Sequence, residues 1–190
     1  LSLVLINRHM KILTKRTLVA LSLALAASSM ARADWPMFQL DGKHTASHPQ
    51  DLLRLPLEKE WSLDTQSIAF GFASAIIANK KIYFGTSRGE VYAVYELSGN
   101  VLWKFVAQGS IYLTPATDNN KLFFGSADGN VYAINPETGV LIWKYETGSN
   151  IMASPIVLSG TLFVASNSGD VLALNADTGE LIWKTNIGDY

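Results

Sequence analysis

The sequence predicts an all-β protein, a β-propeller of four-stranded antiparallel blades with about three and a half blades present and the ring therefore incomplete. Trp103, Trp143 and Trp183 fall at intervals of 40 residues. Each repeat contains four short runs with strand composition, separated by turn residues, and no helical periodicity competes with them. Because one such unit cannot bury both of its faces, neighbouring repeats must stack. A β-sandwich is the structural alternative, but it would not need an equal period.

The repeats divide the chain into predicted domains. Residues 1–33 are expected to be an upstream extension and a cleavable signal peptide. Residues 34–73 are expected to hold a partial, degenerate blade with one strand around Trp61. The three complete repeats span about 74–110, 111–150 and 151–190.

The middle repeat shows how the four strands of a blade are expected to follow one another. Gly129 lies in the turn after the second run, and Gly139 lies in the turn after the third. Glycine can take the positive φ that closes such short loops, a conformation that is costly for residues with a Cβ. The predicted strands cover residues 111–117, 121–126, 130–135 and 141–146.

The first 33 residues have the pattern of an export signal, with five basic and no acidic side chains. Met10 is the predicted start, and residues 1–9 are assigned to an upstream translation start. The charged region Lys11, Lys15 and Arg16 precedes an apolar run over 18–27, and cleavage is predicted after Ala33. A membrane anchor is the alternative, but this run is well short of the roughly 20 residues of a spanning helix. We therefore expect a periplasmic or secreted protein with no stable membrane span after cleavage.

The remaining residues, 34–190, have ten basic and sixteen acidic side chains, a net charge of about −6. This balance argues against nucleic acid as a partner, because phosphate backbones are bound by basic patches. The chain contains no cysteine, so it can form no disulfide and carry no cysteine-linked lipid. Its stability has to come from packing alone.

Two eleven-residue segments, Ala133–Trp143 and Ala173–Trp183, carry a shared signature. They resemble the tryptophan-docking motif of the PQQ-like (pyrroloquinoline quinone) β-propeller repeats of the bacterial envelope. The copy at 93–103 departs from it, with Tyr95 for the Asn/Asp and Ser98 for the Thr, and the opening 34–45 is also similar to mature proteins of this family. The resemblance implies that each tryptophan packs between adjacent blades, where an indole buries on the order of 200 Å². The predicted structural docking residues are Trp61, Trp103, Trp143, Trp183, Gly99, Gly139 and Gly179.

No catalytic, cofactor-binding or metal-binding residue is predicted from the sequence. Three acidic residues of the turns have the oxygen ligands that calcium prefers, but each lies alone near a glycine, where Asp favours local backbone hydrogen bonds. His44 and His48 have helical spacing, yet Gly42 and Pro49 oppose a helix there. The lysines after the tryptophans are interpreted as rim residues. These acids and lysines are Asp128, Asp170, Asp177, Lys104, Lys144 and Lys184.

The function expected from the resemblance is that of a non-enzymatic protein-binding or scaffold module in the periplasm, with another envelope protein as partner. Family dehydrogenases hold PQQ and calcium at the centre of a complete ring, often beside a cysteine pair that this chain lacks. The alternative is the N-terminal part of a PQQ-dependent alcohol or sugar dehydrogenase, and a third reading is a gene remnant. An open arc has too few blades to close, since rings have four to eight. We expect a fragment of a longer chain, or else a homodimer that closes one ring.

Overall fold

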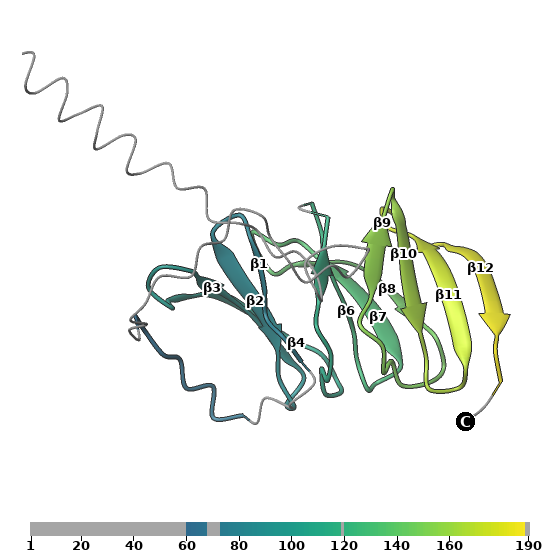
Figure 1. Ribbon diagram of the computed structural model, residues 1–190, viewed down its shortest axis with the longest axis horizontal. Helices are drawn as coiled ribbons and strands as arrows, with labels where there is room; N and C mark the ends of the chain where they lie inside the picture. Colours follow the sequence, from purple (N-terminus) through teal and green to yellow (C-terminus); the bar gives the residue numbers. More distant parts are fainter. Residues whose placement is uncertain (1–59, 68–72, 119, 189–190) are drawn as a thin grey trace, which may run out of the picture. The chain divides into compact units, whose positions relative to one another are not determined.

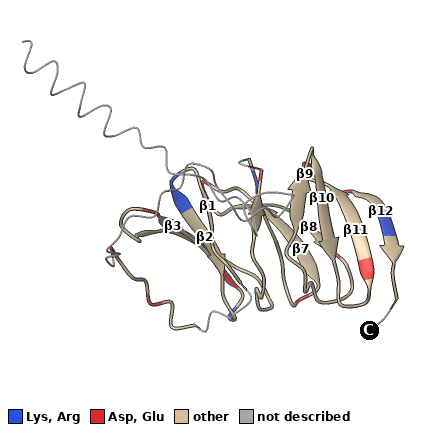
Figure 2. Cartoon of the chain, viewed as in Figure 1, with Lys and Arg blue, Asp and Glu red and all other residues tan. Residues whose placement is uncertain are grey.

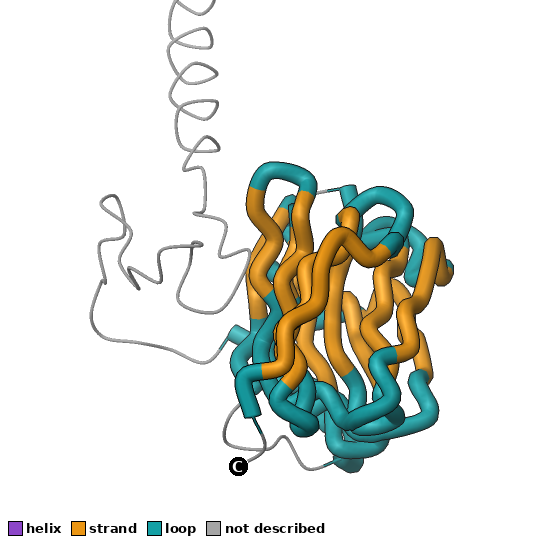
Figure 3. The backbone as a smooth tube through the Cα atoms, turned by 90° about the vertical axis from the view of Figure 1, so that its right-hand side faces the viewer, coloured by secondary structure: helices purple, strands orange, loops and turns teal. Residues whose placement is uncertain are grey.

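The computed structural model describes residues 60–67, 73–118 and 120–188. These residues form no helix and three antiparallel sheets of four strands each. Figures 1 and 3 show how the strands lie side by side in these sheets. The all-β class and the partial propeller of four-stranded blades are therefore confirmed. The signal sequence, the opening segment and the pair His44 and His48 lie outside the described residues.

Each sheet is one blade, and its strands follow the chain in order from one edge to the other. Blade 1 contains β1 Ile76–Ala78, β2 Lys81–Gly85, β3 Glu90–Tyr95 and β4 Val101–Val106. Blade 2 contains β5 Ala116–Thr117, β6 Leu122–Gly125, β7 Asn130–Ile134 and β8 Leu141–Glu146. Blade 3 contains β9 Ile156–Leu158, β10 Thr161–Ala165, β11 Asp170–Asn175 and β12 Leu181–Asn186.

The first strand of blade 2 is shorter than the predicted run 111–117. The N–H of Ile111 donates to the carbonyl oxygen of Thr86 in blade 1, at 3.0 Å, instead of to a strand of its own sheet. Pro115 has no N–H to offer a ladder. Only Ala116 and Thr117 therefore pair with β6.

The strand predicted around Trp61 is wrong within the described residues, because 60–67 contain no strand. The carboxylate of Asp64 accepts a hydrogen bond of 2.8 Å from the N–H of Gln66. Gln66 has a φ of 53°, in the left-handed region that a non-glycine residue seldom adopts. This local turn competes with an extended backbone.

All three blades share one irregularity beside the repeated tryptophan. The register between the third and fourth strands shifts after the alanine that pairs with the tryptophan. A bulge of this kind bends the strand and re-aims its side chains. The small alanine opposite each indole leaves the ring room to tilt against the sheet. The three pairs are Ala93 with Trp103, Ala133 with Trp143 and Ala173 with Trp183.

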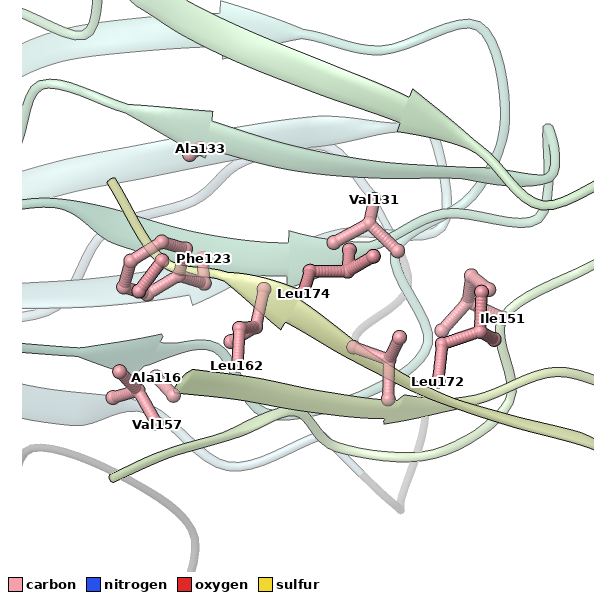
Figure 4. Packing of buried hydrophobic residues seen from close by; sticks show 11 residues of the cluster. Ala116, Phe123, Val131, Ala133, Ile151, Val157, Leu162, Leu172 and Leu174 are labelled. Atoms are coloured by element: carbon pink, nitrogen blue, oxygen red, sulfur yellow. The ribbon is translucent and has the colours of Figure 1, made fainter. Parts of the chain in front are cut away.

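The core lies between the blades. Figure 4 shows the buried cluster shared by blades 2 and 3, in which Phe123 and Val131 of blade 2 lie near Leu162 and Leu174 of blade 3. An equivalent cluster joins blades 1 and 2 and includes Tyr83 and Phe124. Charged side chains occupy few strand positions (Figure 2), so most of the strand surface is available for this apolar packing.

Glycine in the second strand lets the next blade approach closely. A Cβ on Gly85 would lie 2.3 Å from a side-chain atom of Ile111, and one on Gly125 would lie 2.1 Å from Ile151. Both isoleucines are fully buried. Each isoleucine side chain therefore fills the space over the glycine of the preceding blade and holds the two blades together.

Within residues 60–67, 73–118 and 120–188, no helix has the length and apolar character needed to cross a membrane.

Candidate functional site at the blade junctions

Three tryptophans each donate a hydrogen bond to a neighbouring blade. Trp103 Nε1 donates to the carbonyl oxygen of Pro136 at 3.0 Å. Trp143 Nε1 donates to that of Ala176 at 3.2 Å. Trp61 Nε1 donates to that of Glu96 in blade 1 at 2.8 Å. Each half-buried indole thus satisfies its only polar group on the neighbouring blade.

The rings lie against three glycines of the same neighbouring blades. A Cβ on Gly139 would come within 2.8 Å of the Trp103 ring, and one on Gly179 within 2.7 Å of the Trp143 ring. The equivalent distance from Gly99 to the Trp61 ring is 2.4 Å. These glycines have φ values of 70° to 76°, where a Cβ is also strained. We call each glycine with the acceptor carbonyl three residues before it a docking notch: Glu96–Gly99, Pro136–Gly139 and Ala176–Gly179.

Trp183 has the same sequence context but a different environment. Its ring lies 6.2 Å from that of Phe163 at 49°, close to the 5.9 Å and 42° of Trp143 with Phe123. Yet Trp183 is 44% exposed, and no glycine of the described residues meets its ring. Trp61, Trp103 and Trp143 therefore each lie in a docking notch. Trp183 has the same orientation against its own blade, but no notch of the described residues covers its ring.

Ion pairs add a second contact at the two junctions between complete blades. Lys81 of blade 1 pairs with Glu137 of blade 2 at 2.7 Å, and Lys121 of blade 2 pairs with Asp177 of blade 3. The lysine side chains are largely covered, whereas the carboxylates are exposed. Sequence reasoning missed these pairs. The recurrence of Lys–acid pairs 56 residues apart is the signal that would have found them.

Asp128 ties the turn of blade 2 to blade 1. Its carboxylate accepts hydrogen bonds from the Tyr132 hydroxyl at 2.7 Å, the Asn130 N–H at 2.9 Å and the Gln108 N–H of the loop after β4 at 3.0 Å. Burial raises the pKa of Asp128, but the hydrogen bonds from Tyr132 and Asn130 outweigh burial, so its pKa lies below the ordinary value. Burial and the Asp128 hydrogen bond raise the pKa of Tyr132.

In blade 3, Asp170 holds the outer strand instead of the neighbouring blade. Its carboxylate pairs with Lys184 at 2.7 Å and accepts hydrogen bonds from Asn186 and Ser168. The Lys184 contact is the main cause that lowers the pKa of Asp170 to about 2. In blade 1, Lys104 forms the equivalent pair with Glu90 at 2.9 Å.

The described acids do not form the ligand set that calcium needs. No three His, Cys, Asp or Glu side chains gather in the part of the chain that the structure describes. Asp128, Asp170 and Asp177 each direct their oxygens to protein donors, and each does so in a separate network. Calcium needs six to eight converging oxygens, so these three residues do not together form a calcium site.

Residues 55–189 match the model of the PQQ-like family described as outer membrane protein assembly factor BamB. The chain belongs to this family. No curated protein matches it by sequence. Since the match includes all three blades and the Trp61 segment, the docking contacts are those of a PQQ-like repeat protein.

Solved structures of related fold are also found. BamB from Moraxella catarrhalis is 22% identical, with a TM-score of 0.52 over 56% of this chain and 33% of that chain. Quinohemoprotein alcohol dehydrogenase from Comamonas testosteroni is 23% identical, with a TM-score of 0.73 over 84% of this chain and 28% of that chain. At this identity the likeness shows the fold alone. The chain spans about a third or less of the length of these proteins.

Proposed function

We propose that the chain acts as a non-enzymatic protein-binding or scaffold module in the periplasm and binds another envelope protein. The observation that carries the proposal is the match over 55–189 to a family described by an outer-membrane assembly factor. Four ion pairs also support it, because their charged groups join strands or blades.

The outer strands supply a surface that suits a protein partner. Equivalent positions of β4, β8 and β12 carry exposed apolar side chains, repeated once per blade. Exposed apolar side chains that recur on the outer strands of successive blades support an interaction surface there, and we call this set the row. The row contains Val101, Leu102, Leu141, Ile142, Leu181 and Ile182.

Capture from a bacterial envelope extract tests this proposal. The full chain is the bait, and a variant with Leu102, Ile142 and Ile182 replaced by Asp is the matched control. We expect a specific envelope protein to be recovered by the bait and lost with the control. Recovery of the same proteins by both, or of none, would count against protein binding through this row.

Export is proposed on the basic and apolar pattern of residues 1–33. Expression in a bacterium followed by cell fractionation should place the protein in the periplasm. Its mass should correspond to a chain that begins at Asp34. An uncleaved chain in the membrane fraction would instead support a permanent anchor.

A second candidate function is part of a PQQ-dependent alcohol or sugar dehydrogenase. It rests on the dehydrogenase fold that covers 84% of this chain. Titration of the full-length protein with PQQ and calcium, followed by dye-linked oxidation of alcohols and sugars, tests it. Binding with oxidation would support an enzyme, whereas the absence of both in the full-length protein would count against this candidate.

A further inference from the structure

The outer strands β4, β8 and β12 differ in whether their own blade neutralises the lysine that follows the tryptophan. In blade 1, Lys104 pairs with Glu90 at 2.9 Å. In blade 3, Lys184 pairs with Asp170 at 2.7 Å. Lys144 has the equivalent position in β8 and is exposed, but it forms no ion pair with any of the described residues. Its charge is therefore available to a partner.

Blade 2 lacks the neutralising acid because its acid lies two residues earlier in the sequence. Asn130 stands at the position that the acids of blades 1 and 3 occupy, and its side-chain amide donates to the carboxylate of Asp128 at 3.0 Å. That carboxylate also accepts hydrogen bonds from the Tyr132 hydroxyl and the Gln108 N–H. Asp128 thus holds its own turn and the preceding blade, and leaves the lysine of β8 without a counter-charge.

Glu146 is a second exposed charge of β8 that forms no ion pair with the described residues. The equivalent residues of β4 and β12 are uncharged, Val106 and Asn186. Alternate residues of a strand point to the same face. Glu146 and Lys144 therefore place a negative and a positive charge side by side in a fixed order, a pattern found on β8 and on neither of the other two outer strands.

The edge of β8 can also pair with a backbone. β8 is the last strand of its sheet, so the N–H and C=O groups along its outer side pair with no described strand. Leu141 and Ile142, at its beginning, are 42% and 44% exposed. Ile142 is the extra residue of the bulge and has no partner in β7. An edge with these features suits an extended segment, which adds backbone hydrogen bonds to side-chain contacts.

We propose that β8 is the docking edge for an extended segment of the envelope partner, an inference that rests on the proposed function. The segment runs antiparallel to β8. From its N-terminus it carries a basic residue opposite Glu146, an acidic residue opposite Lys144 and an apolar residue beside Ile142, with one residue between successive members of the set. Blade 2 lies between two described blades, to which the two buried clusters join it.

The order of the two charges decides which segments bind. Opposite charges directly across an antiparallel pair stabilise it, and like charges destabilise it. A lysine and a bulge on an edge otherwise discourage strand pairing. Segments without the matching order are therefore rejected, which makes the edge selective and protects the chain from unspecific association.

Two synthetic peptides of identical composition test the proposal on the full chain. The forward peptide has the order lysine, threonine, glutamate, threonine, leucine, and the reversed peptide exchanges the lysine and the glutamate; both have threonines at each end. We expect the backbone amide signals of β8 to shift when the forward peptide is titrated and followed by NMR. The dissociation constant of the forward peptide should be about tenfold lower than that of the reversed peptide at low salt, and salt should reduce this ratio.

The double variant K144E/E146K provides the matched exchange on the protein. It keeps the composition and the net charge and reverses the order of the charges, so it should prefer the reversed peptide by a similar factor. Lys104→Gln is the control, because it removes an outer lysine of another blade that Glu90 already pairs. It should leave both dissociation constants unchanged, and circular dichroism checks that each variant is folded.

Several results would overturn docking on β8. These are equal dissociation constants for the two peptides, an unchanged preference in K144E/E146K, shifts confined to strands other than β8, and no shift with either peptide at millimolar concentration. Capture from envelope extract separates this inference from the proposed function. A partner that is lost with the row variant but still recovered by K144E/E146K would leave protein binding intact and overturn docking on β8. Preference for the forward peptide would support this edge even if the capture recovered no envelope protein.

Discussion

The middle and last blades carry nearly the same motif, yet their tryptophans have different surroundings. Trp143 donates to Ala176 and lies against Gly179 of blade 3. Trp183 has the same orientation over a phenylalanine but is 44% exposed. The motif positions the indole within its own blade, and burial depends on the next notch. Docking is thus a property of two blades, and the comparison can be tested by changing one blade at a time.

The largest expected effect separates the two tryptophans. Trp143→Ala should lower the free energy of unfolding by about 3 kcal/mol, because it leaves a cavity at the junction of blades 2 and 3 and an unpaired carbonyl. Trp183→Ala should cost less than about 1 kcal/mol, since Trp183 is already 44% exposed and no notch of the described residues receives its ring. Urea unfolding of both variants and the wild type measures the difference. Equal losses would show that Trp183 is buried in solution.

The next largest effect concerns the contact between the Trp143 ring and Gly179. Gly179 and Gly160 are both in blade 3 and have the same φ of 76°. A Cβ on Gly179 would meet the Trp143 ring at 2.7 Å, whereas one on Gly160 would meet nothing within 4 Å. Gly160→Ala should cost about 1 kcal/mol from φ alone, and Gly179→Ala about 2 to 3 kcal/mol from φ and the clash together. Similar losses in urea unfolding would mean that the ring does not lie on Gly179.

Asp128 of the middle blade and Asp170 of the last blade should stabilise the fold over different ranges of pH. Asp128→Asn should cost about 1 kcal/mol at neutral pH, because it weakens the bonds from Tyr132 and Gln108. The folded pKa values of Asp128 and Asp170 are both lowered. Their contributions are therefore full above the unfolded pKa of about 3.9 and are lost as the pH falls below it.

For Asp170 that loss should continue down to a pH of about 2. Unfolding of the wild type, D128N and D170N between neutral and acid pH measures these windows. The difference between each variant and the wild type should shrink as the pH falls. A difference that grows in acid would contradict the assigned pKa directions.

The smallest effect concerns the ion pairs. Lys121→Met keeps the covered stem and removes the charge that pairs with Asp177, so it should cost about 0.5 kcal/mol at low salt and less at high salt. Thr161→Lys in blade 3 should change the free energy of unfolding by less than this, since no acid of a following blade lies opposite it in the described residues. Urea unfolding at two salt concentrations compares them. A larger effect of T161K would show that this face of blade 3 is covered.

The sequence predicted correctly those features that depend on residues of a single blade. The turn at Gly139 and the strand Leu141–Glu146 follow from local composition and spacing, and the period of 40 predicted the stacking of blades. The predicted strands failed at Trp61 and over 111–115, because these segments bond to a blade other than their own or form a local turn. The acceptor carbonyls and the lysine pairs were missed, since no single repeat contains both partners.

By itself, the sequence determined the all-β class, the number of strands in a blade and which side chains recur, because each depends on periodicity and turn chemistry within 40 residues. Only the tertiary structure decided which glycine receives which tryptophan, that Asp128 acts between blades while Asp170 acts within one, and that Trp61 fills the notch of blade 1. The physical reason is that the contacts between blades join groups 20 to 56 residues apart, and their energy depends on distance and desolvation across a junction.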